Sequence, residues 1–200
     1  MIKQKFRKIL IKAVRSIYYC QRHIILTRDL KVPKISLDDI HIRSIREDSE
    51  ALTDLSNHVP HKAKIIQQRL EAGVDCYVVY NDTNKMIAYG WYATRDFYEP
   101  MQDVTFMLQK GQVYPFDVEL LEEYRGQFML APKLAYLFWN HYITLGYNNI
   151  ICMVDLKNTA SLQLHAFMNF KEFGEMILTR FIFTKPFTTR RRYTGSYFDQ

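Results

Sequence analysis

The chain has 200 residues, of which 48% are hydrophobic and 14% aromatic, and it carries a formal net charge of +6 at pH 7. This length fits one domain with appendages, and a chain of this size buries about 70% of its unfolded surface without disulfide support. Because it has no run of roughly 18 apolar residues and no continuous apolar N-terminal core, we expect neither a membrane-spanning helix nor a secretory signal.

The positive charge is uneven. Before Asp29 the chain has no acidic residue and eight basic ones, namely Lys3, Lys5, Arg7, Lys8, Lys12, Arg15, Arg22 and Arg28. Apolar residues recur between them at spacings of three and four, which predicts a basic amphipathic helix over residues 2–20. Such a helix suits peripheral contact with an anionic membrane, binding to an acidic partner, or packing on its own domain or on a second subunit of a homodimer. Basic helices also bind nucleic acid, but no nucleic-acid motif accompanies this one, so we expect no such partner.

The segments up to Arg95 alternate between helix and strand patterns. Residues 21–38 read as a connector, because Pro33 and Ser36 interrupt it. A hairpin over residues 75–95, with its turn at Asn81–Asn84, is indicated by β-forming residues on both sides of a polar turn. Before the hairpin we predict a strand over 41–45 and helices over 47–57 and 61–72.

The second half repeats strand and helix patterns. Pro115 lies inside a predicted central strand over 113–121 and removes a ladder donor, which indicates a bulge or an exposed edge. The other predicted elements are a short strand at 104–108 in the irregular region 96–112, a helix from Pro132 to Leu145, a buried strand over 149–154, a helix capped by Asn158, and a final strand or strand pair over 173–183. Residues 185–200 read as a mobile basic tail.

Two motifs carry a resemblance to a known family. The segment Leu120-Leu-Glu-Glu-Tyr-Arg-Gly126 opens a helix, and Asn158-Thr-Ala-Ser-Leu-Gln-Leu-His-Ala-Phe-Met-Asn-Phe170 follows the next strand. Together they resemble the GNAT superfamily of acyl-CoA-dependent N-acyltransferases. Phe128 and Leu130 stand where that family prefers glycine, Asn169 replaces a glycine, and His165 replaces a tyrosine.

The resemblance implies an α+β (mixed α/β) fold. The expected body, residues 39–184, is a single domain with a central mixed, mostly antiparallel twisted sheet, a splayed central strand pair and helices on both faces. Residues 1–38 would be a leader, and residues 185–200 a tail.

The resemblance also implies a site for acetyl-CoA as co-substrate. Backbone amides at a helix start bind phosphate readily, and the loop after Tyr124 would hold the pyrophosphate. The implied cofactor-binding residues are Leu120 and Leu121 through their backbone, Arg125, Gly126, Gln127, Phe128, Met129, Leu130 and Ala131 in the loop, and Asn158 and Ser161 beyond it.

The predicted chemistry needs a base for the amine and an acid for the departing thiolate. Asp117 and Glu119 lie on one side of the central strand by period two, and either is a candidate base, with Tyr114 as a third. His165 shares a helical stripe with Asn158 and Ser161 and is the candidate acid. The alternatives are ion pairing at a strand end for the carboxylates and simple packing for His165.

The histidines and the cysteines Cys20, Cys76 and Cys152 lack ligand spacing, so no metal is expected. The cysteine usage suits a reducing, cytoplasmic compartment, and the basic leader would allow peripheral contact with the inner face of the membrane. The sequence thus predicts an N-acetyltransferase that acts by direct attack of a primary amine in a ternary complex. Amino sugars, polyamines, peptide N-termini and aminoglycosides remain possible acceptors, with a mild preference for an amino sugar or envelope precursor. The alternative is a non-catalytic CoA-binding or membrane-associated interaction module with the same fold.

Overall fold

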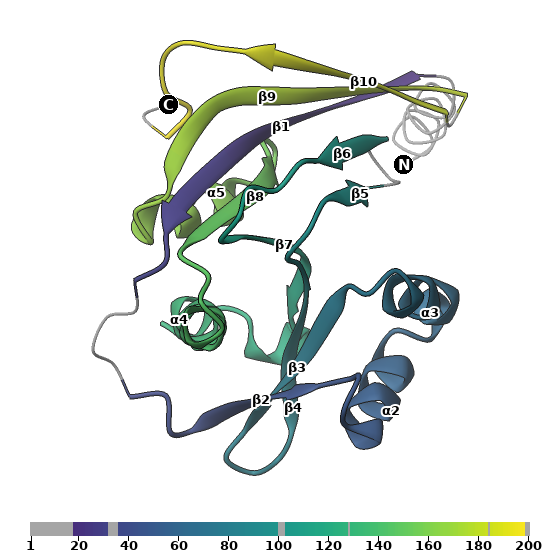
Figure 1. The fold of residues 1–200 in the computed structure, drawn as a ribbon, viewed down its shortest axis with the longest axis vertical. Coiled ribbons are helices and arrows are strands. Elements are labelled where there is room, and N and C mark those ends of the chain that lie inside the picture. The colour runs from purple at the N-terminus through teal and green to yellow at the C-terminus, as the bar shows by residue number, and fades with distance from the viewer. Residues whose placement is uncertain (1–17, 32–35, 100–102, 128, 184, 199–200) are drawn as a thin grey trace, which may run out of the picture. The chain divides into compact units, whose positions relative to one another are not determined.

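Figure 1 shows the computed structural model, which describes residues 18–31, 36–99, 103–127, 129–183 and 185–198. By its internal contacts the chain divides into two compact units that interleave along the sequence. The first, here called the α4 unit, comprises Arg28–Arg95 and Leu108–Cys152. The second, the β9 unit, comprises the described residues of Met1–Thr27, Asp96–Met107 and Met153–Gln200.

The elements of the α4 unit agree with the sequence-based predictions to within a few residues. They are β2 (Ile40–Ser44), α2 (Ser49–His58), η1 (Pro60–Lys62), α3 (Ala63–Glu71), β3 (Asp75–Asn81), β4 (Met86–Ala93), β7 (Gln112–Leu120), η2 (Glu122–Tyr124), α4 (Leu130–Thr144) and the start of β8 (Asn149–Asp155). Pro132 lies in the first turn of α4, where its missing N–H costs nothing.

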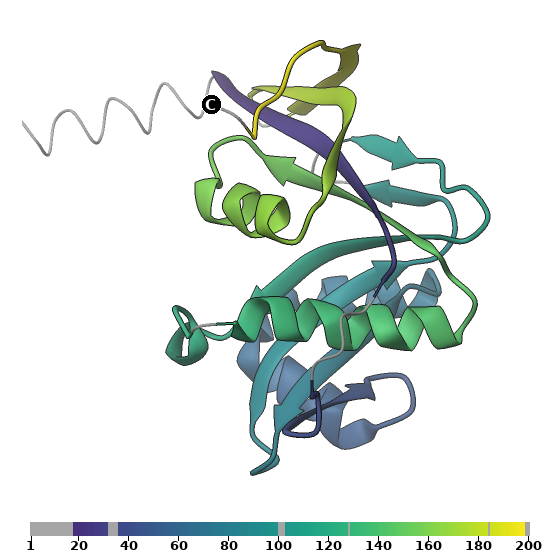
Figure 2. The ribbon, with the colours of Figure 1, turned by 90° about the vertical axis from the view of Figure 1, so that its left-hand side faces the viewer.

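The sheet of the α4 unit is covered by helices on both faces. Its strand order is β8-β7-β4-β3-β2, with antiparallel pairing except between β7 and β8. Figures 1 and 2 show α4 on one face and α2 and α3 on the other. Period-two alternation explains this arrangement, because Tyr92 of β4 contacts Phe138 of α4 at 4.7 Å between ring centroids, while the neighbouring Trp91 lies under Arg69 of α3.

The β9 unit contains three neighbouring antiparallel strands of the eight-stranded sheet, in the order β10-β9-β1. The strands are β1 (Tyr18–Asp29), β9 (Lys171–Ile182) and β10 (Lys185–Arg192). The unit also contains the short pair β5 (Phe97–Glu99) and β6 (Val104–Phe106) and the helix α5 (Thr159–Phe167). As predicted, Asn158 caps α5: its side-chain oxygen accepts a hydrogen bond from the Ser161 amide at 3.1 Å.

Two sequence-based expectations were wrong. Tyr18–Cys20 and residues 21–29 form β1 instead of a helix end and a connector, because Ile24 and Leu26 are fully buried and the strand pairs with β9. Residues 185–192 form β10 instead of a mobile tail, because their backbone completes a ladder on β9. Pro186 is tolerated there, since β10 is an edge strand.

The predicted mixed α+β fold with a mostly antiparallel sheet is confirmed. The predicted leader helix, apart from Tyr18–Cys20, lies outside the described residues. The boundaries of leader, body and tail at residues 38 and 184 stay a prediction. Of the helices in the described part of the chain, none is both long and apolar enough to cross a membrane.

Candidate active site

A β-bulge in β7 organises the polar side chains on the α3 face of the sheet. Tyr89 pairs with Glu119, but Trp91 pairs with Phe116, so Asp117 and its neighbour stand opposite Gly90 alone. Asp117 has a φ of 47°, an uncommon backbone conformation for a residue with a side chain. A bulge shifts the alternation of the strand by one residue. Phe116 and Glu119, which would otherwise point to opposite faces, therefore both point toward α3, and Asp117 turns to the same side.

Gly90 makes room for this bulge. A Cβ atom at residue 90 would come within 3.0 Å of the Tyr92 ring and 3.2 Å of the Val118 side chain. Both contacts are closer than a real Cβ tolerates without movement of the neighbour. The bulge predicted from Pro115 is thus present two residues further on, at Asp117.

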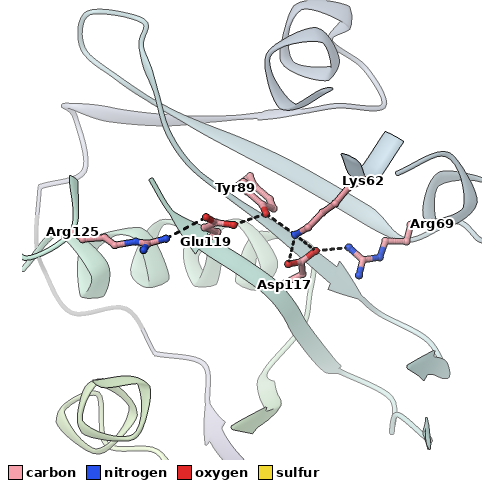
Figure 3. Close-up of polar contacts among 6 residues, drawn as sticks. All are labelled: Lys62, Arg69, Tyr89, Asp117, Glu119 and Arg125. Atoms are coloured by element: carbon pink, nitrogen blue, oxygen red, sulfur yellow. Dashed lines mark hydrogen bonds and ion pairs between the residues drawn. The ribbon is translucent and has the colours of Figure 1, made fainter. Parts of the chain in front are cut away.

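A continuous chain of hydrogen bonds joins the two carboxylates (Figure 3). Arg69 donates to Asp117 at 2.7 Å, and Lys62 donates to the same carboxylate at 2.9 and 3.1 Å. The Lys62 ammonium also donates to the Tyr89 hydroxyl at 3.0 Å, and that hydroxyl donates to Glu119 at 2.7 Å. Because Lys62 can only donate, the direction of the Tyr89 hydroxyl is fixed toward Glu119.

Asp117 is bound by two cations and is a poor base. Burial alone would raise its pKa, but the hydrogen bonds and charges of Arg69 and Lys62 outweigh burial and hold the pKa of Asp117 below its ordinary value. A carboxylate in this state stays ionised and accepts a proton weakly. In the structure Asp117 holds the Lys62 ammonium in place. From the sequence alone, Asp117 and Glu119 were equal candidates for the base.

Of the two carboxylates joined by these hydrogen bonds, Glu119 is the more exposed. One of its oxygens accepts the Tyr89 hydroxyl proton, and the other contacts Arg125 at 3.2 Å. Arg125 is 57% exposed by its side chain, so its contribution to holding Glu119 is small. Burial, and then the hydrogen bond to Glu119, raise the pKa of Tyr89 well above its ordinary range, so the phenol keeps its proton and continues to donate it. The third candidate base, Tyr114, is 1% exposed and stacks on Phe116 in the core.

β7 and β8 part soon after they meet. Their parallel ladder joins only Gln112 to Asn149 and Val113 to Ile150. From Tyr114 to Leu120, β7 has no described ladder partner on the β8 side, while its other edge pairs with β4 as far as Leu120. The splayed central strand pair expected from the sequence is therefore present, and it leaves one backbone edge of β7 open.

The predicted phosphate loop follows β7 directly. Gly126 has a φ of 80°, and a Cβ atom placed on it would meet nothing within 4 Å. Met129 caps α4 in a left-handed conformation with a φ of 64°. The Leu130 amide bonds to the Gln127 carbonyl at 3.3 Å, but among the described residues the amides of Gly126, Met129 and Ala131 have no protein acceptor. These amides form a helix start that can bind an anion. Phe128 lies outside the described residues.

Two of the predicted backbone contacts are already engaged in the protein. The Leu121 amide donates to the Ile87 carbonyl at 3.0 Å, and the Leu120 carbonyl accepts from Arg125 at 2.9 Å. Contact of the cofactor with these two residues stays a prediction. The Leu120 carbonyl can accept a second hydrogen bond, whereas the single hydrogen of the Leu121 amide is already donated to Ile87.

The residues predicted on α5 lie in the β9 unit. The Nδ1–H of His165 donates to the Ser161 carbonyl at 2.7 Å, which leaves Nε2 as an acceptor in the neutral ring. Burial lowers the pKa of His165. A neutral imidazole with an accepting Nε2 does not supply a proton to a thiolate, so this geometry gives no support to the predicted acid role. Asn169 keeps the left-handed conformation, with a φ of 57°, in place of the glycine of the motif.

Lys62, Arg69 and Tyr89 were not predicted as site residues from the sequence. A signal for the first two was present, because Lys62, Ile66 and Arg69 are spaced at i, i+4 and i+7 and share one helical stripe. Ile66 is buried on the sheet, so two cations flanking it must reach the same strand surface. Tyr89 gave no signal, since a tyrosine in a buried strand reads as core. The described residues contain no cluster of histidine, cysteine and carboxylate groups suited to a metal ion.

No protein-family model and no curated protein sequence matches the chain. Several solved structures do match the chain. A conserved protein of unknown function from Staphylococcus epidermidis matches with a TM-score of 0.57 and 11% identity, over 86% of this chain and 65% of that one. The GCN5-related glucosamine N-acetyltransferase region of a fungal multi-domain β-N-acetylglucosaminidase has a TM-score of 0.57 and 16% identity, over 84% and 22%. A GNAT-family acetyltransferase from Colwellia psychrerythraea has a TM-score of 0.54 and 16% identity, over 82% and 56%.

The chain therefore has the fold of the GCN5-related N-acetyltransferases, as the two motifs predicted. It spans less than two thirds of the length of each of these three structures. At such low identity the likeness concerns the fold, and what the chain does has to be argued from its own residues.

Proposed function

We propose that the chain is an N-acyltransferase that moves an acyl group, with acetyl as the first choice, from the thioester of coenzyme A to a primary amine. The observation that carries this proposal is the parting of β7 from β8 after two residue pairs, followed at the end of β7 by a helix start with unused amides. An open strand edge accepts the amide groups of a pantetheine arm as if they were another strand. The helix start then receives the pyrophosphate.

Glu119 is the base in this proposal. An alkylamine is protonated at neutral pH and must lose a proton before it attacks the thioester carbonyl. Glu119 takes that proton directly or through a water molecule, and the nitrogen–carbon bond forms as the carbon–sulfur bond breaks. A thiol has a pKa of about 8.5, so the thiolate leaves with little help. The acylated nitrogen loses its remaining extra proton, which reaches the thiolate directly or through solvent, and the products are a neutral amide and free coenzyme A. No covalent enzyme intermediate is needed.

The surrounding side chains hold Glu119 in place. Tyr89 donates to it, Lys62 fixes the direction of the Tyr89 hydroxyl, and Asp117 fixes Lys62. The proposed cofactor contacts remain Leu120, Leu121, the loop residues Arg125 to Ala131, Asn158 and Ser161.

Among acceptors, glucosamine is the first to test. One similar structure is described as a glucosamine N-acetyltransferase region, and amino sugars were already the mild preference from the sequence. The proposal itself requires only a primary amine.

Release of free coenzyme A from acetyl-CoA, measured with a panel of amines, tests the proposal. The panel should contain glucosamine, a polyamine, a peptide with a free N-terminus and an aminoglycoside. Because Cys20 is partly accessible while Cys76 and Cys152 are buried, chromatographic quantification of coenzyme A avoids the background of thiol reagents. Amine-dependent release supports the enzyme, and its absence across the panel contradicts it.

A non-catalytic acyl-CoA-binding module is the second candidate. It is favoured by one observation, the left-handed Met129 where the loop motif is otherwise rich in glycine. Binding of acetyl-CoA without turnover of any amine would select this reading.

A further inference from the structure

One face of the β1–β9–β10 strands carries positive charge that has no ion-pair partner among the described residues. The register places Tyr18 beside Ile182 and Ile182 beside Lys185, and places Arg180 beside Phe187. Residues at every second position share this face. Its charged and exposed apolar members are here called the cationic face: Tyr18, Arg22, Arg180, Ile182, Lys185, Phe187 and Arg191. The same face also carries Ile24 and Leu178, which are buried.

The charges of the cationic face are not used within the described protein. No carboxylate in the described ranges lies within ion-pair distance of Arg22, Arg180, Lys185 or Arg191. The acidic residue nearest to them in strand order and on the same side of β9, Glu172, is engaged by Tyr193, Ser196 and the amides that follow.

The opposite face of the same sheet is different. There Arg190 lies over the Phe106 ring at 5.5 Å and within 4.0 Å of Glu175, and Lys157 lies over the Tyr19 ring. Arg190 and Lys157 thus have partners inside the β9 unit, and Arg192, on the same side, lies beside Glu175 in the register. Among the described residues, the cations of the cationic face have no ion-pair partner.

Large apolar side chains are exposed among these free cations. Tyr18 is 49% exposed, Ile182 is 41% exposed and Phe187 is 54% exposed. Figure 1 shows that the three strands run side by side, so the apolar and basic residues form one surface. A surface that combines free cations with exposed aliphatic and aromatic groups matches the boundary of an anionic bilayer, where headgroups take the charges and the acyl region takes the apolar groups.

We infer that the cationic face is a docking surface for an anionic lipid membrane. Residues 2–17, which precede Tyr18 in the sequence, carry six further basic side chains. Two weak signals on one chain give stable attachment where one gives marginal binding. A nucleic acid would use the same cations, and its bases could stack on Tyr18 and Phe187, but it offers no favourable site to Ile182.

Vesicle sedimentation of the full chain tests this inference. The vesicles contain phosphatidylcholine alone or with about 30% phosphatidylserine, the kind of anionic surface to which basic segments bind. The wild type should sediment with the anionic vesicles only, and about 1 M salt, which shortens the screening length to about 3 Å, should release most of it.

Variants of the cationic face isolate its contribution. Each basic residue near such a surface contributes about a fivefold gain in partitioning, so Lys185→Gln with Arg191→Gln should weaken binding about 25-fold. Lys64→Gln with Lys110→Gln makes the same change in net charge at exposed residues of the α4 unit and should change binding by less than about twofold. Arg22→Gln, which leaves the edge strand β10 untouched, should weaken vesicle binding about fivefold. Phe187→Ser should remove the part of the binding that persists at high salt.

Thermal unfolding of each variant shows that it is folded. Equal sedimentation of the Lys185/Arg191 variant and its Lys64/Lys110 control would overturn the inference. So would the absence of vesicle binding combined with tight binding of a single-stranded oligonucleotide. Neither result depends on acyltransferase activity.

Discussion

Two groups of charged side chains, one in each unit, differ in how their charges are compensated. In the α4 unit, Lys62 and Arg69 share Asp117 at 2.7 to 3.1 Å, and Tyr89 links them to Glu119. On the cationic face of the β9 unit, the basic side chains have no such partner in the described protein. Paired charges fix local geometry, whereas unpaired ones remain available to an external partner. Changes at the first group should therefore alter turnover or stability, and changes at the second should alter neither.

The largest expected effect is that of Glu119→Gln. Removal of a positioned base typically costs about 10²–10⁴-fold in rate, and the amide can still accept the Tyr89 proton, so the fold should persist. The measurement is kcat for coenzyme A release with the best amine, together with thermal unfolding. Unchanged kcat in a folded variant would remove Glu119 from its proposed role.

Asp117→Asn should act mainly on stability. It leaves Lys62 and Arg69, which are 23% and 15% exposed, without their shared counter-charge, and a loss of about 1–3 kcal/mol in the free energy of unfolding follows. Turnover should fall far less than in Glu119→Gln. An equal loss of turnover in a folded variant would mean that Asp117 is itself the base.

The stability difference between wild type and Asp117→Asn should also depend on pH. The pKa of Asp117 is lower in the folded protein than in the unfolded chain. Its contribution is therefore fully present above the unfolded value of about 3.9 and disappears as the pH falls through the lowered folded value. Denaturant unfolding at pH 7 and at several acidic values measures this, and a difference that grows on acidification would contradict the ion pairing.

Tyr89→Phe should give a smaller loss, of about 10- to 100-fold in kcat with KM little changed, since one hydrogen bond to a charged group is worth about 1.5–3 kcal/mol. Steady-state kinetics separate the two parameters. Tyr80→Phe is a matched control, because its hydroxyl also donates to a carboxylate, Asp54, which lies outside the proposed site. Equal losses in both variants would show a general effect of removing a buried phenol.

The smallest expected effect is that of Lys185→Gln with Arg191→Gln on stability and turnover. Exposed substitutions without partners usually change the free energy of unfolding by less than about 0.5 kcal/mol. A larger loss, measured by denaturant unfolding, would mean that these cations are compensated within the protein, and the contrast between the two units would fail.

The sequence predicted the α4 unit well because its signals are local. Alternating β-forming residues, the Asn81–Asn84 turn and Pro132 each determine structure over a few residues. β1 and β10 were missed because each forms a strand by pairing with β9. For β1 this partner lies far away in the sequence, and for β10 it supplies the ladder of hydrogen bonds that the sequence pattern does not show. Arg190 to Arg192 look like a solvated tail until the register with β9 is known.

The candidate site was predicted in part for the same reason. Gly126 belongs to the motif Leu120–Gly126, and Glu119 was a candidate base from its period-two position on the central strand. The preference for Glu119 over Asp117 depends on Lys62 and Arg69, which are more than forty positions away from Asp117, and on a bulge whose position Pro115 indicated only approximately. The proton on Nδ1 of His165 is set by the Ser161 carbonyl, and no sequence pattern shows it.

Calorimetric titration with acetyl-CoA tests the central claim most directly, that the parted β7 edge and the start of α4 hold an acyl-CoA thioester. Gly126→Ala should weaken binding, because residue 126 has a φ of 80° in the loop, whereas Gly146→Ala, with a φ of 88° at the far end of α4, carries the same backbone strain away from it. The account predicts one molecule bound per chain, weakened in the Gly126 variant and unchanged in the Gly146 variant. No binding at millimolar acetyl-CoA, or equal binding by both variants and the wild type, would contradict it.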